Sequence, residues 1–281
     1  MALRDIISGK TGIPESRIPG SYQLIGGIVL VKFSSVTAQA DKVKIARGIL
    51  ESLKSVRSVY ESRGISGEFR EPDVIFLAGE RNPTTLHKEH GISYMVDVSK
   101  VMFSKGNLFE RQRVIGSIKP GETVVDMFSG IGYFSLGIAK FTDAAQVISI
   151  EKNPDSFSLL CRNIEINKIT GITPVLGDCR DVSEMDDFRG IAERVMMGYL
   201  PGTSRFLTSA FRFIKEGGII HYHDAVPEKD IWSGPEKEIR SHAASSGFEI
   251  EIIGKRKVKS FAPRKWHVAI DFRAFRKDHC R

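Results

Sequence analysis

The stretch Val124–Ser135, VVDMFSGIGYFS, constrains the fold more than any other part of the chain. Its β-branched start follows Pro120-Gly121, so a buried strand is predicted directly after a turn. Gly130 and Gly132 then allow a sharp turn in which the backbone lies close to a ligand. Apolar residues at helical spacing follow. The stretch therefore predicts a strand, a glycine turn and a helix.

From this stretch onward, strand-like and helix-like segments alternate. We predict strands at 123–126, 146–150, 173–176, 194–197 and 218–222, and helices at 133–141, 154–167, 202–214 and 236–246. Such alternation is typical of an α/β fold with a doubly wound, mostly parallel sheet and helices on both faces. In this architecture, ligands bind outside the carboxyl ends of the strands.

Three regions are predicted along the chain. Residues 1–65 form a small N-terminal α/β domain, with a strand at 28–31, a helix at 38–53 and a second strand at 55–61. Residues 66–118 connect this domain to the next one and contribute to a cofactor site, with a strand at 94–98 and a helix at 108–118. Residues 119–281 form the Rossmann-like catalytic domain.

Composition limits the class of protein. The 281 residues carry 41 basic and 34 acidic side chains, which gives a net charge of +7. This charge suits a polyanion such as nucleic acid, and it equally suits an ordinary basic enzyme. The three cysteines form no CxxC pair, which favours a cytoplasmic protein without disulfides or a zinc finger. No apolar run reaches the roughly 18 residues of a membrane helix.

Acidic residues stand at the ends of three successive predicted strands. Asp126 precedes the glycine turn, Glu151 ends the second strand, and Asp178 follows the third. A carboxylate at the second strand end can accept both ribose hydroxyls, and a polar group after the third can meet an adenine amino group. Together these positions predict an adenosine site. The alternative is that the acids only cap strand ends.

The glycine turn also bears on the choice of cofactor. GIGYFS is an incomplete dinucleotide fingerprint, because Ser135 stands where the third small residue belongs. A pyrophosphate needs the helix N-terminus, and Asp126 is poorly placed beside it. S-adenosylmethionine carries a sulfonium cation and an amino group instead of phosphate, so a carboxylate suits it. We therefore favour S-adenosylmethionine over a nicotinamide dinucleotide.

Two further strand ends carry motifs with more than one interpretation. The fourth reads GYLP from Gly198 to Pro201, and many nucleic-acid amino-methylases of this fold have asparagine in place of that glycine. Tyr199 either stacks on a base or packs on its neighbours. His221 and His223 near the fifth strand end could share a metal, but no third ligand is evident, so we predict no metal.

The C-terminal stretch predicts two strands joined by a basic loop around Pro263. Its cations and aromatics are Lys255, Arg256, Lys257, Lys259, Phe261, Arg264, Lys265 and Trp266. Interleaved cations and aromatics suit phosphate contact with base stacking, and they equally suit an ordinary charged hairpin.

Four segments resemble a pair of sister families: GISYMVDVSKVMFSKGNLFERQRV, PGETVVDMFSGIGYFSLGIAK, IEKNPDSFSLLCRNIEINKI and RVMMGYLPGTSRFLTSAFRFIKEGGIIHYHD. One is the tRNA guanosine-37 N1-methyltransferase family. The other transfers the 3-amino-3-carboxypropyl group of S-adenosylmethionine in wybutosine biosynthesis. The methylating branch carries Asn-Leu-Pro-Pro at the fourth strand end. The GYLP at Gly198 and the SKGN at Ser104 look like the aminocarboxypropyl branch.

The resemblance implies a fold, a class I S-adenosylmethionine-dependent methyltransferase, and a set of site residues. Motif matching places cofactor contacts on Ser104, Arg111, Glu151, Asp178 and Cys179, to which we add Asp126, Phe128, Gly130, Lys152 and Gly198. Glu110 matches the glutamate that is the general base of the methylating branch. We take Glu110 and Arg111 as candidate catalytic residues, with the role of Glu110 open because the acceptor atom is a carbon.

The resemblance also implies a reaction. The 3-amino-3-carboxypropyl group passes to the tricyclic modified guanosine at position 37 of tRNA(Phe), and methylthioadenosine is released. One alternative is N1-methylation of guanosine 37, and another is a non-catalytic RNA-binding protein of this fold. The expected partner is the anticodon region of tRNA(Phe), and we expect a cytoplasmic monomer that uses neither a membrane nor a metal.

Overall fold

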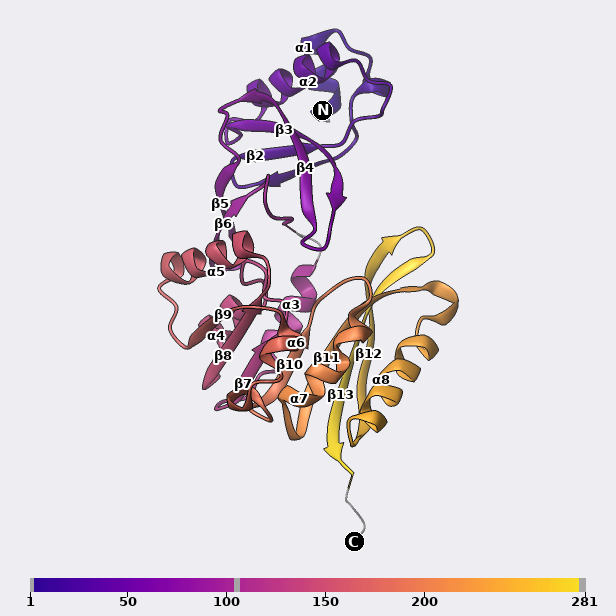
Figure 1. Ribbon diagram of the computed structural model, residues 1–281. Helices are drawn as coiled ribbons and strands as arrows, with labels where there is room; N and C mark the ends of the chain where they lie inside the picture. The colour runs from indigo at the N-terminus through magenta and orange to yellow at the C-terminus, as the bar shows by residue number, and fades with distance from the viewer. Residues whose placement is uncertain (1–2, 104–106, 278–281) are drawn as a thin grey trace. The chain divides into compact units, whose positions relative to one another are not determined.

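The computed structural model describes residues 3–103 and 107–277. The chain divides into two compact units, Met1–Ser104 and Lys105–Arg281 (Figure 1). Ser104 to Gly106, which include the predicted cofactor residue Ser104, lie outside the described residues.

The N-terminal unit is a small α/β fold. Its helices are α1 (Leu3–Thr11) and α2 (Gln39–Ser52), with a 3₁₀ turn at Glu15–Arg17. Its main strands are β1 (Tyr22–Ile25), β2 (Ile28–Val31), β3 (Ser58–Ser66) and β4 (Glu71–Gly79), which form a sheet in that order. The strands β5 (Thr84–Glu89) and β6 (Ile92–Asp97) form a separate hairpin.

A continuous apolar core holds the N-terminal unit together. Ile45, Ala46 and Ile49 recur at helical spacing on α2, and all are buried against Val29 and Val59 of the sheet. Because β2 and β3 are parallel, the chain needs a crossover between them, and α2 supplies it.

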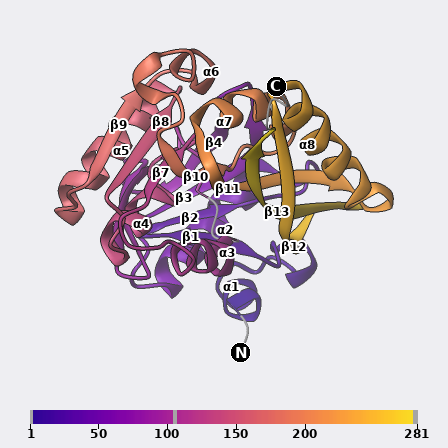
Figure 2. The same cartoon turned by 90° about the horizontal axis from the view of Figure 1, so that it is seen from below.

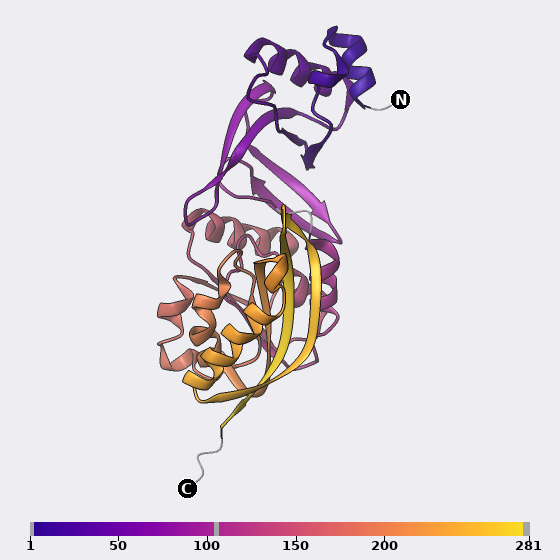
Figure 3. The same ribbon diagram turned by 90° about the vertical axis from the view of Figure 1, so that its right-hand side faces the viewer.

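The C-terminal unit contains a seven-stranded sheet in the order β12-β13-β11-β10-β7-β8-β9. The parallel strands are β7 (Thr123–Asp126), β8 (Gln146–Glu151), β9 (Ile172–Leu176), β10 (Ala192–Met197) and β11 (Ile214–Pro227). The hairpin of β12 (Phe248–Ala262) and β13 (Lys265–Arg276) adds antiparallel to β11. Figure 3 shows the two long hairpin strands side by side in yellow.

Helices cover both faces of this sheet. They are α3 (Leu108–Ile115), α4 (Ser135–Phe141), α5 (Pro154–Asn167), α6 (Cys179–Val182), α7 (Leu207–Phe213) and α8 (Ser233–Ser245), with 3₁₀ turns at Asp186–Phe188, Thr203–Phe206 and Glu228–Asp230. Figure 2 shows α3 and α4 on one side and α6, α7 and α8 on the other. Val124 packs with residues of α3 and α4, and Val125 packs with residues of α6, α7 and α8. The two face opposite sides of the sheet because they are successive residues of a strand.

The order of the strands places a ligand site. From β7 the chain moves outward through β8 and β9, then returns to place β10 on the other side of β7. The two connections therefore diverge at the carboxyl ends of β7 and β10, where ligands bind in open α/β sheets. The Met127 amide there donates to the Met196 carbonyl oxygen at 3.1 Å, which joins the two strand ends.

The predicted fold class is confirmed, and some predicted element ends are wrong. The helix expected at 108–118 ends at Ile115, where Gly116 caps it. The strand expected at 218–222 extends over 214–227, because β13 pairs with it from Ile219 to Pro227. Sequence patterns do not show pairing between distant strands, so such extensions are decided by the tertiary fold. Among the described residues, no helix is long and apolar enough to cross a membrane.

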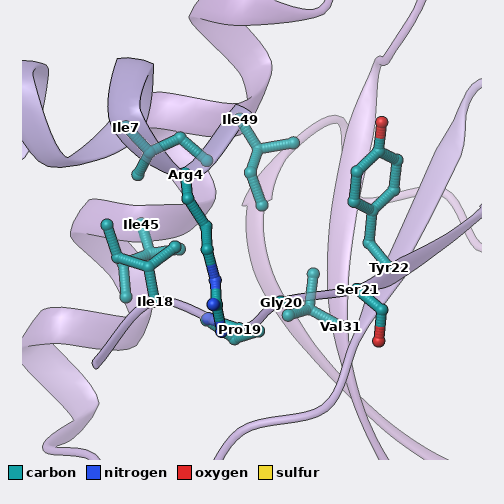
Figure 4. Close-up of a pocket in the computed structure, with 10 residues that line it drawn as sticks. All are labelled: Arg4, Ile7, Ile18, Pro19, Gly20, Ser21, Tyr22, Val31, Ile45 and Ile49. Atoms are coloured by element: carbon teal, nitrogen blue, oxygen red, sulfur yellow. The ribbon is translucent and has the colours of Figure 1, made fainter. Parts of the chain in front are cut away.

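A cavity of about 110 Å³ lies in the N-terminal unit, between α1, α2 and the first strand. Figure 4 shows Arg4 among the isoleucines of this cavity, with Tyr22 at its margin. Its lining contains no carboxylate and none of the predicted site residues. The cavity is also smaller than the roughly 300 Å³ of a typical small-molecule site. We therefore build the candidate site at the strand ends of the C-terminal unit.

Candidate functional site

The glycine turn after β7 forms the floor of the candidate site. Gly130 has φ of 55°, and a Cβ there would lie 2.9 Å from the ring of Tyr133. Gly132 has φ of 98°, and a Cβ there would lie 2.6 Å from Leu136. Both positions therefore require glycine for conformational and for steric reasons. The two glycines thus let the turn pack closely against Tyr133 and Leu136.

Asp126 ends β7 with a fully buried carboxylate. The Ser135 hydroxyl donates to Oδ2 at 2.7 Å, and the Phe128 amide faces Oδ1 at 3.4 Å. Burial raises the pKa of Asp126 to about 6, and these hydrogen bonds only partly offset the effect. At neutral pH the group is therefore mostly ionised but held at an energetic cost, and it favours a nearby cation.

Glu151 ends β8 and ties that strand to the glycine turn. Its Oε2 accepts from the Gly130 amide at 2.7 Å, and its Oε1 accepts from the Asn153 amide at 2.7 Å. Burial raises the pKa of the carboxylate, against these hydrogen bonds. The predicted pair of Gly130 and Glu151 is thus in direct contact, on the β8 side of the turn.

Asp178 follows β9 and lies beside two cations. Arg180 donates to Oδ1 and Oδ2 at 3.0 and 2.6 Å, and the Lys152 ammonium lies 3.2 Å from Oδ2. The Arg180 hydrogen bond is the main reason that the pKa of Asp178 is well below its usual range. Burial raises the pKa of the neighbouring Cys179 thiol to about 12, so this cysteine is a neutral side chain rather than a nucleophile.

An aromatic cluster closes the β10 side of the site. Phe128 lies 5.3 Å from the ring of Tyr199 and 4.8 Å from that of Phe206. The Arg205 guanidinium lies over both Tyr199 and Phe206, at 5.0 and 4.9 Å. Of the two interpretations of Tyr199, packing on its neighbours is the one seen in this structure.

Gly198 differs from the glycines of the turn. Its φ is not positive, and an added Cβ would make only an ordinary contact of 3.7 Å with Phe134. The backbone therefore does not require glycine here. What position 198 lacks is a polar side chain at the edge of the site.

Helix α3 contributes Glu110 and Arg111, both almost fully buried. The Arg111 guanidinium lies 5.4 Å from the centre of the Tyr133 ring, which follows the glycine turn. Both oxygens of Glu110 accept from Arg113, at 2.6 and 3.0 Å. The helix thus brings Arg111 to the turn and places Glu110 in an ion pair.

The two histidines of β11 have protein partners. His221 lies 2.7 Å from Asp271 and 3.1 Å from Arg194, and His223 lies 3.1 Å from His267. Burial lowers the pKa of His223 and of His267 to about 3, so both rings are neutral. Among residues 3–103 and 107–277, no three His, Cys, Asp or Glu side chains are grouped as a metal site would need.

The arrangement suits an adenosine that carries a cationic arm. Glu151 ends β8 with its carboxylate against the glycine turn, and a carboxylate at this strand end can accept ribose hydroxyls. Asp126 offers negative charge in a buried setting, which complements a sulfonium or ammonium group. Arg111 offers a planar guanidinium suited to a carboxylate.

Five residues beside the site are not among the predicted site residues. They are Ser135, Phe206, Arg113, Asp271 and His267. The three-residue spacing of Glu110 and Arg113 signals a helical ion pair and could have been found. Asp271 is 158 residues from Arg113, and no local pattern links the two.

Two family models match the chain. The TRM5/TYW2 methyltransferase domain matches residues 85–253, and the TYW2 N-terminal domain matches residues 3–82. The chain is 39% identical over 250 residues to the tRNA(Phe) (4-demethylwyosine(37)-C(7)) aminocarboxypropyltransferase of Methanocaldococcus jannaschii, which covers 89% of this chain and 96% of that protein.

Other relatives belong to both branches. The tRNA (guanine(37)-N(1))-methyltransferase Trm5b of Pyrococcus abyssi is 37% identical over 257 residues, or 91% of this chain and 75% of that protein. The crystal structure of P. horikoshii TYW2 in complex with MeSAdo matches with a TM-score of 0.84, 35% identity and 98% coverage of both chains. The chain therefore belongs to the TRM5/TYW2 methyltransferase family.

Proposed function

We propose that this protein is an S-adenosylmethionine-dependent tRNA aminocarboxypropyltransferase of wybutosine biosynthesis. It transfers the 3-amino-3-carboxypropyl group to the tricyclic modified guanosine at position 37 of tRNA(Phe) and releases methylthioadenosine. The observation that carries the proposal is the extent of the match to the aminocarboxypropyltransferase of M. jannaschii, 96% of whose length is covered. The match of residues 3–82 to the TYW2 N-terminal domain supports the same branch.

The cofactor site that we propose lies at the carboxyl ends of β7, β8, β9 and β10. Glu151 accepts the ribose hydroxyls, and Gly130 lets the cofactor approach the backbone. Asp126 faces the cationic part of the cofactor, and Phe128 borders it. Lys152, Asp178, Cys179, Gly198 and Ser104 complete the proposed set. This assignment is supported by the contacts that already join Gly130 to Glu151 and Lys152 to Asp178.

Transfer of the aminocarboxypropyl group is a substitution at the γ-carbon next to the sulfonium. A carbon–carbon bond forms to the acceptor ring, the carbon–sulfur bond breaks with its electron pair left on sulfur, and the proton of the ring carbon passes to water. The sulfonium is already a good leaving group, so the protein acts mainly by positioning. We assign Arg111 to the carboxylate of the transferred arm, because a guanidinium can hold it with two parallel hydrogen bonds.

Gly198 bears on which carbon is attacked. Methylation and aminocarboxypropyl transfer use the same cofactor and differ in the group that faces the acceptor. The backbone at 198 accepts a side chain without strain, so the fold does not require glycine at this position. We propose that the missing polar side chain removes a grip on the acceptor that a methylating site would use.

We also propose a setting for the reaction. The protein acts on the anticodon region of tRNA(Phe), as a monomer in the cytoplasm, and needs no metal ion. The net charge of +7 suits a polyanionic substrate. Cys161 and Cys179 are free thiols, which suits a reducing compartment.

A double-label experiment tests the reaction. The protein is incubated with tRNA(Phe) bearing the tricyclic base and with S-adenosylmethionine labelled either in the methyl or in the carboxyl group. We expect carboxyl label to enter the tRNA in a one-to-one ratio with released methylthioadenosine.

The alternatives give different results in the same experiment. Methyl label in the tRNA, with S-adenosylhomocysteine as product, would show N1-methylation or another methyl transfer instead. Binding of tRNA without transfer of either label would favour a non-catalytic RNA-binding protein. Glu151→Gln serves as the control, because it weakens the proposed ribose contact and should reduce transfer of either label.

A further inference from the structure

A buried network of charged groups joins α3 to the sheet. Arg113 stands at its centre, with its guanidinium between the carboxylates of Glu110 and Asp271. It donates to Glu110 at 2.6 and 3.0 Å and to Asp271 at 2.5 and 3.2 Å. All five side-chain donors of an arginine are fixed in one plane, so two such pairs fix its position closely.

The network continues from Asp271 on β13 into β11 and β10. His221 contacts Asp271 through Nδ1 at 2.7 Å and Arg194 through Nε2 at 3.1 Å. Arginine can only donate, so Nε2 of His221 accepts and its Nδ1–H donates to Asp271. Arg194 also donates to Glu122 and to the Ser117 carbonyl oxygen at 2.5 and 2.6 Å. Four elements of the unit are thus linked through one row of hydrogen bonds.

Glu110 is placed as a member of this network. Its side chain is only 1% exposed, and both oxygens are already occupied by Arg113. Two further nitrogens, Nε2 of His223 and Nε of Arg256, lie 3.7 and 3.8 Å from its oxygens. A general base must come within hydrogen-bond reach of the proton that it removes. The buried carboxylate of Glu110 is instead hydrogen-bonded to Arg113, which favours a structural role.

Arg113 and Asp271 carry opposite charges within the network. Burial works against the charge of Asp271, yet hydrogen bonds from His221 and Arg113 hold its pKa below its usual range. Burial likewise opposes the charge of Arg113, and the hydrogen bonds that it donates to Glu110 and Asp271 raise its pKa. Removing one buried partner therefore leaves the others uncompensated, so each member restrains the rest.

Arg111 follows Glu110 on the same short helix. Its guanidinium is buried beside Tyr133, at the glycine turn. A shift of the helix by a fraction of a turn would move this guanidinium away from the turn, because consecutive residues of a helix share one rigid backbone. Whatever fixes Glu110 and Arg113 therefore also fixes Arg111.

We propose that Asp271, Arg113 and Glu110 are positioning residues, which clamp α3 so that Arg111 is set to hold the carboxylate of the S-adenosylmethionine arm. The inference rests on the proposed function, in which Arg111 takes that role. It assigns Glu110 to orientation of the Arg113 side chain on the same helix, rather than to proton removal. Asp271 on β13 pairs with Arg113, and we assign it no contact with the cofactor or the acceptor.

Two ligands separate positioning from general support of the fold. S-adenosylmethionine carries the aminocarboxypropyl arm, and methylthioadenosine has the same adenosine without it. We expect Asp271→Asn to raise the dissociation constant of S-adenosylmethionine about 10-fold, as loss of a charged hydrogen bond would. The dissociation constant of methylthioadenosine should change less than about 2-fold, since it makes no contact with Arg111. Calorimetric titration of the full-length protein measures both.

Further variants keep the test decisive. Arg113→Lys keeps the charge but loses the two-sided pairing, so it should show the same selectivity even if Asp271→Asn folds poorly. Glu193→Gln is the matched control. Glu193 accepts from the Thr123 amide at 2.7 Å at the amino end of β7, away from the candidate site, and its loss should change neither constant.

Each outcome decides the proposal. If Asp271→Asn and Arg113→Lys weaken the binding of both ligands equally, the network only supports the fold. If neither variant weakens the binding of S-adenosylmethionine, the proposed clamp is also wrong. Arg111→Ala separates this idea from the assignment of Arg111. If Arg111→Ala alone discriminates between the ligands, the clamp is wrong and the assignment stands. If Arg111→Ala does not discriminate, the assignment is wrong and the clamp, which acts through it, falls as well.

Discussion

Asp126 shows how a single residue combines a structural cost with a functional use. Its carboxylate is buried at the end of β7, with the Ser135 hydroxyl as its closest partner at 2.7 Å. Burial raises its pKa from 3.8 to about 6. The folded protein therefore holds the proton over a pH range in which the unfolded chain has lost it, and folding becomes less favourable as pH rises through that range.

This behaviour predicts a pH-dependent effect of Asp126→Asn. Well below pH 3.8 the carboxylate is protonated in both states, so the substitution should change the free energy of unfolding little. Between pH 4 and 6 the wild type loses stability while the variant does not. Above pH 6 the variant should be more stable by at most about 3 kcal/mol, the equivalent of a two-unit shift. Urea unfolding at pH 4.5, 5.5 and 7.0 measures the difference.

The same substitution should weaken binding of S-adenosylmethionine at pH 7, because the negative charge near the cationic arm is lost. Asp143→Asn, in an exposed turn, is the control and should leave both stability and binding unchanged. A stability difference that stays constant from pH 4.5 to 7.0 would contradict the link between burial and protonation at Asp126.

Among the elements, the hairpin of β12 and β13 leaves two interpretations open. The Lys257 ammonium lies 4.9 Å from the centre of the Trp266 ring, and the Trp266 indole donates to Glu228 at 3.2 Å. Phe261 is exposed nearby along the hairpin. Lysines on an edge strand prevent pairing with other chains, and cations beside aromatics also suit RNA. A binding measurement separates these explanations.

We expect Lys257→Ala to weaken binding of tRNA several-fold. A lysine that contacts a phosphate releases about one counterion on binding, so the slope of log affinity against log salt should fall by about one. Binding of S-adenosylmethionine should not change. Fluorescence titration with tRNA(Phe) at several salt concentrations measures the slope.

A matched control exists on α4. The Lys140 ammonium lies 5.9 Å from the ring of Phe141, so Lys140→Ala removes the same charge from a similar cation–aromatic pair. Lys140→Ala should leave the slope unchanged. If both variants reduce the slope equally, the hairpin has no particular part in binding tRNA and its lysines serve the edge strand.

At the scale of the whole molecule, stability is coupled to the cofactor. A ligand that binds only the folded state stabilises it by about 2.7 kcal/mol at a concentration 100 times its dissociation constant. We therefore expect S-adenosylmethionine to raise the unfolding temperature by several degrees. For a monomer, the midpoint should not depend on protein concentration over a 100-fold range. A midpoint that rises with protein concentration would show that folding is coupled to assembly, against the proposed monomer.

Local patterns in the sequence determined the fold class and the cofactor. Strands that end in Asp126, Glu151 and Asp178 are recognisable because each follows a short apolar run, and the glycine turn is recognisable because only glycine accepts its backbone angles. In a parallel sheet such strand ends meet at one edge, so local patterns predict that the residues at these ends lie close together. Those features depend on near neighbours in the chain.

Only the tertiary structure decided the partners of these residues. Arg113 and Asp271 are 158 residues apart, and β11 is long because a strand from the chain terminus pairs with it. Such contacts depend on which distant segments the fold brings together, and no spacing in the sequence records that. The sequence alone therefore gave Glu110 only a role implied by resemblance, whereas the buried guanidinium between Glu110 and Asp271 points to its work as a clamp.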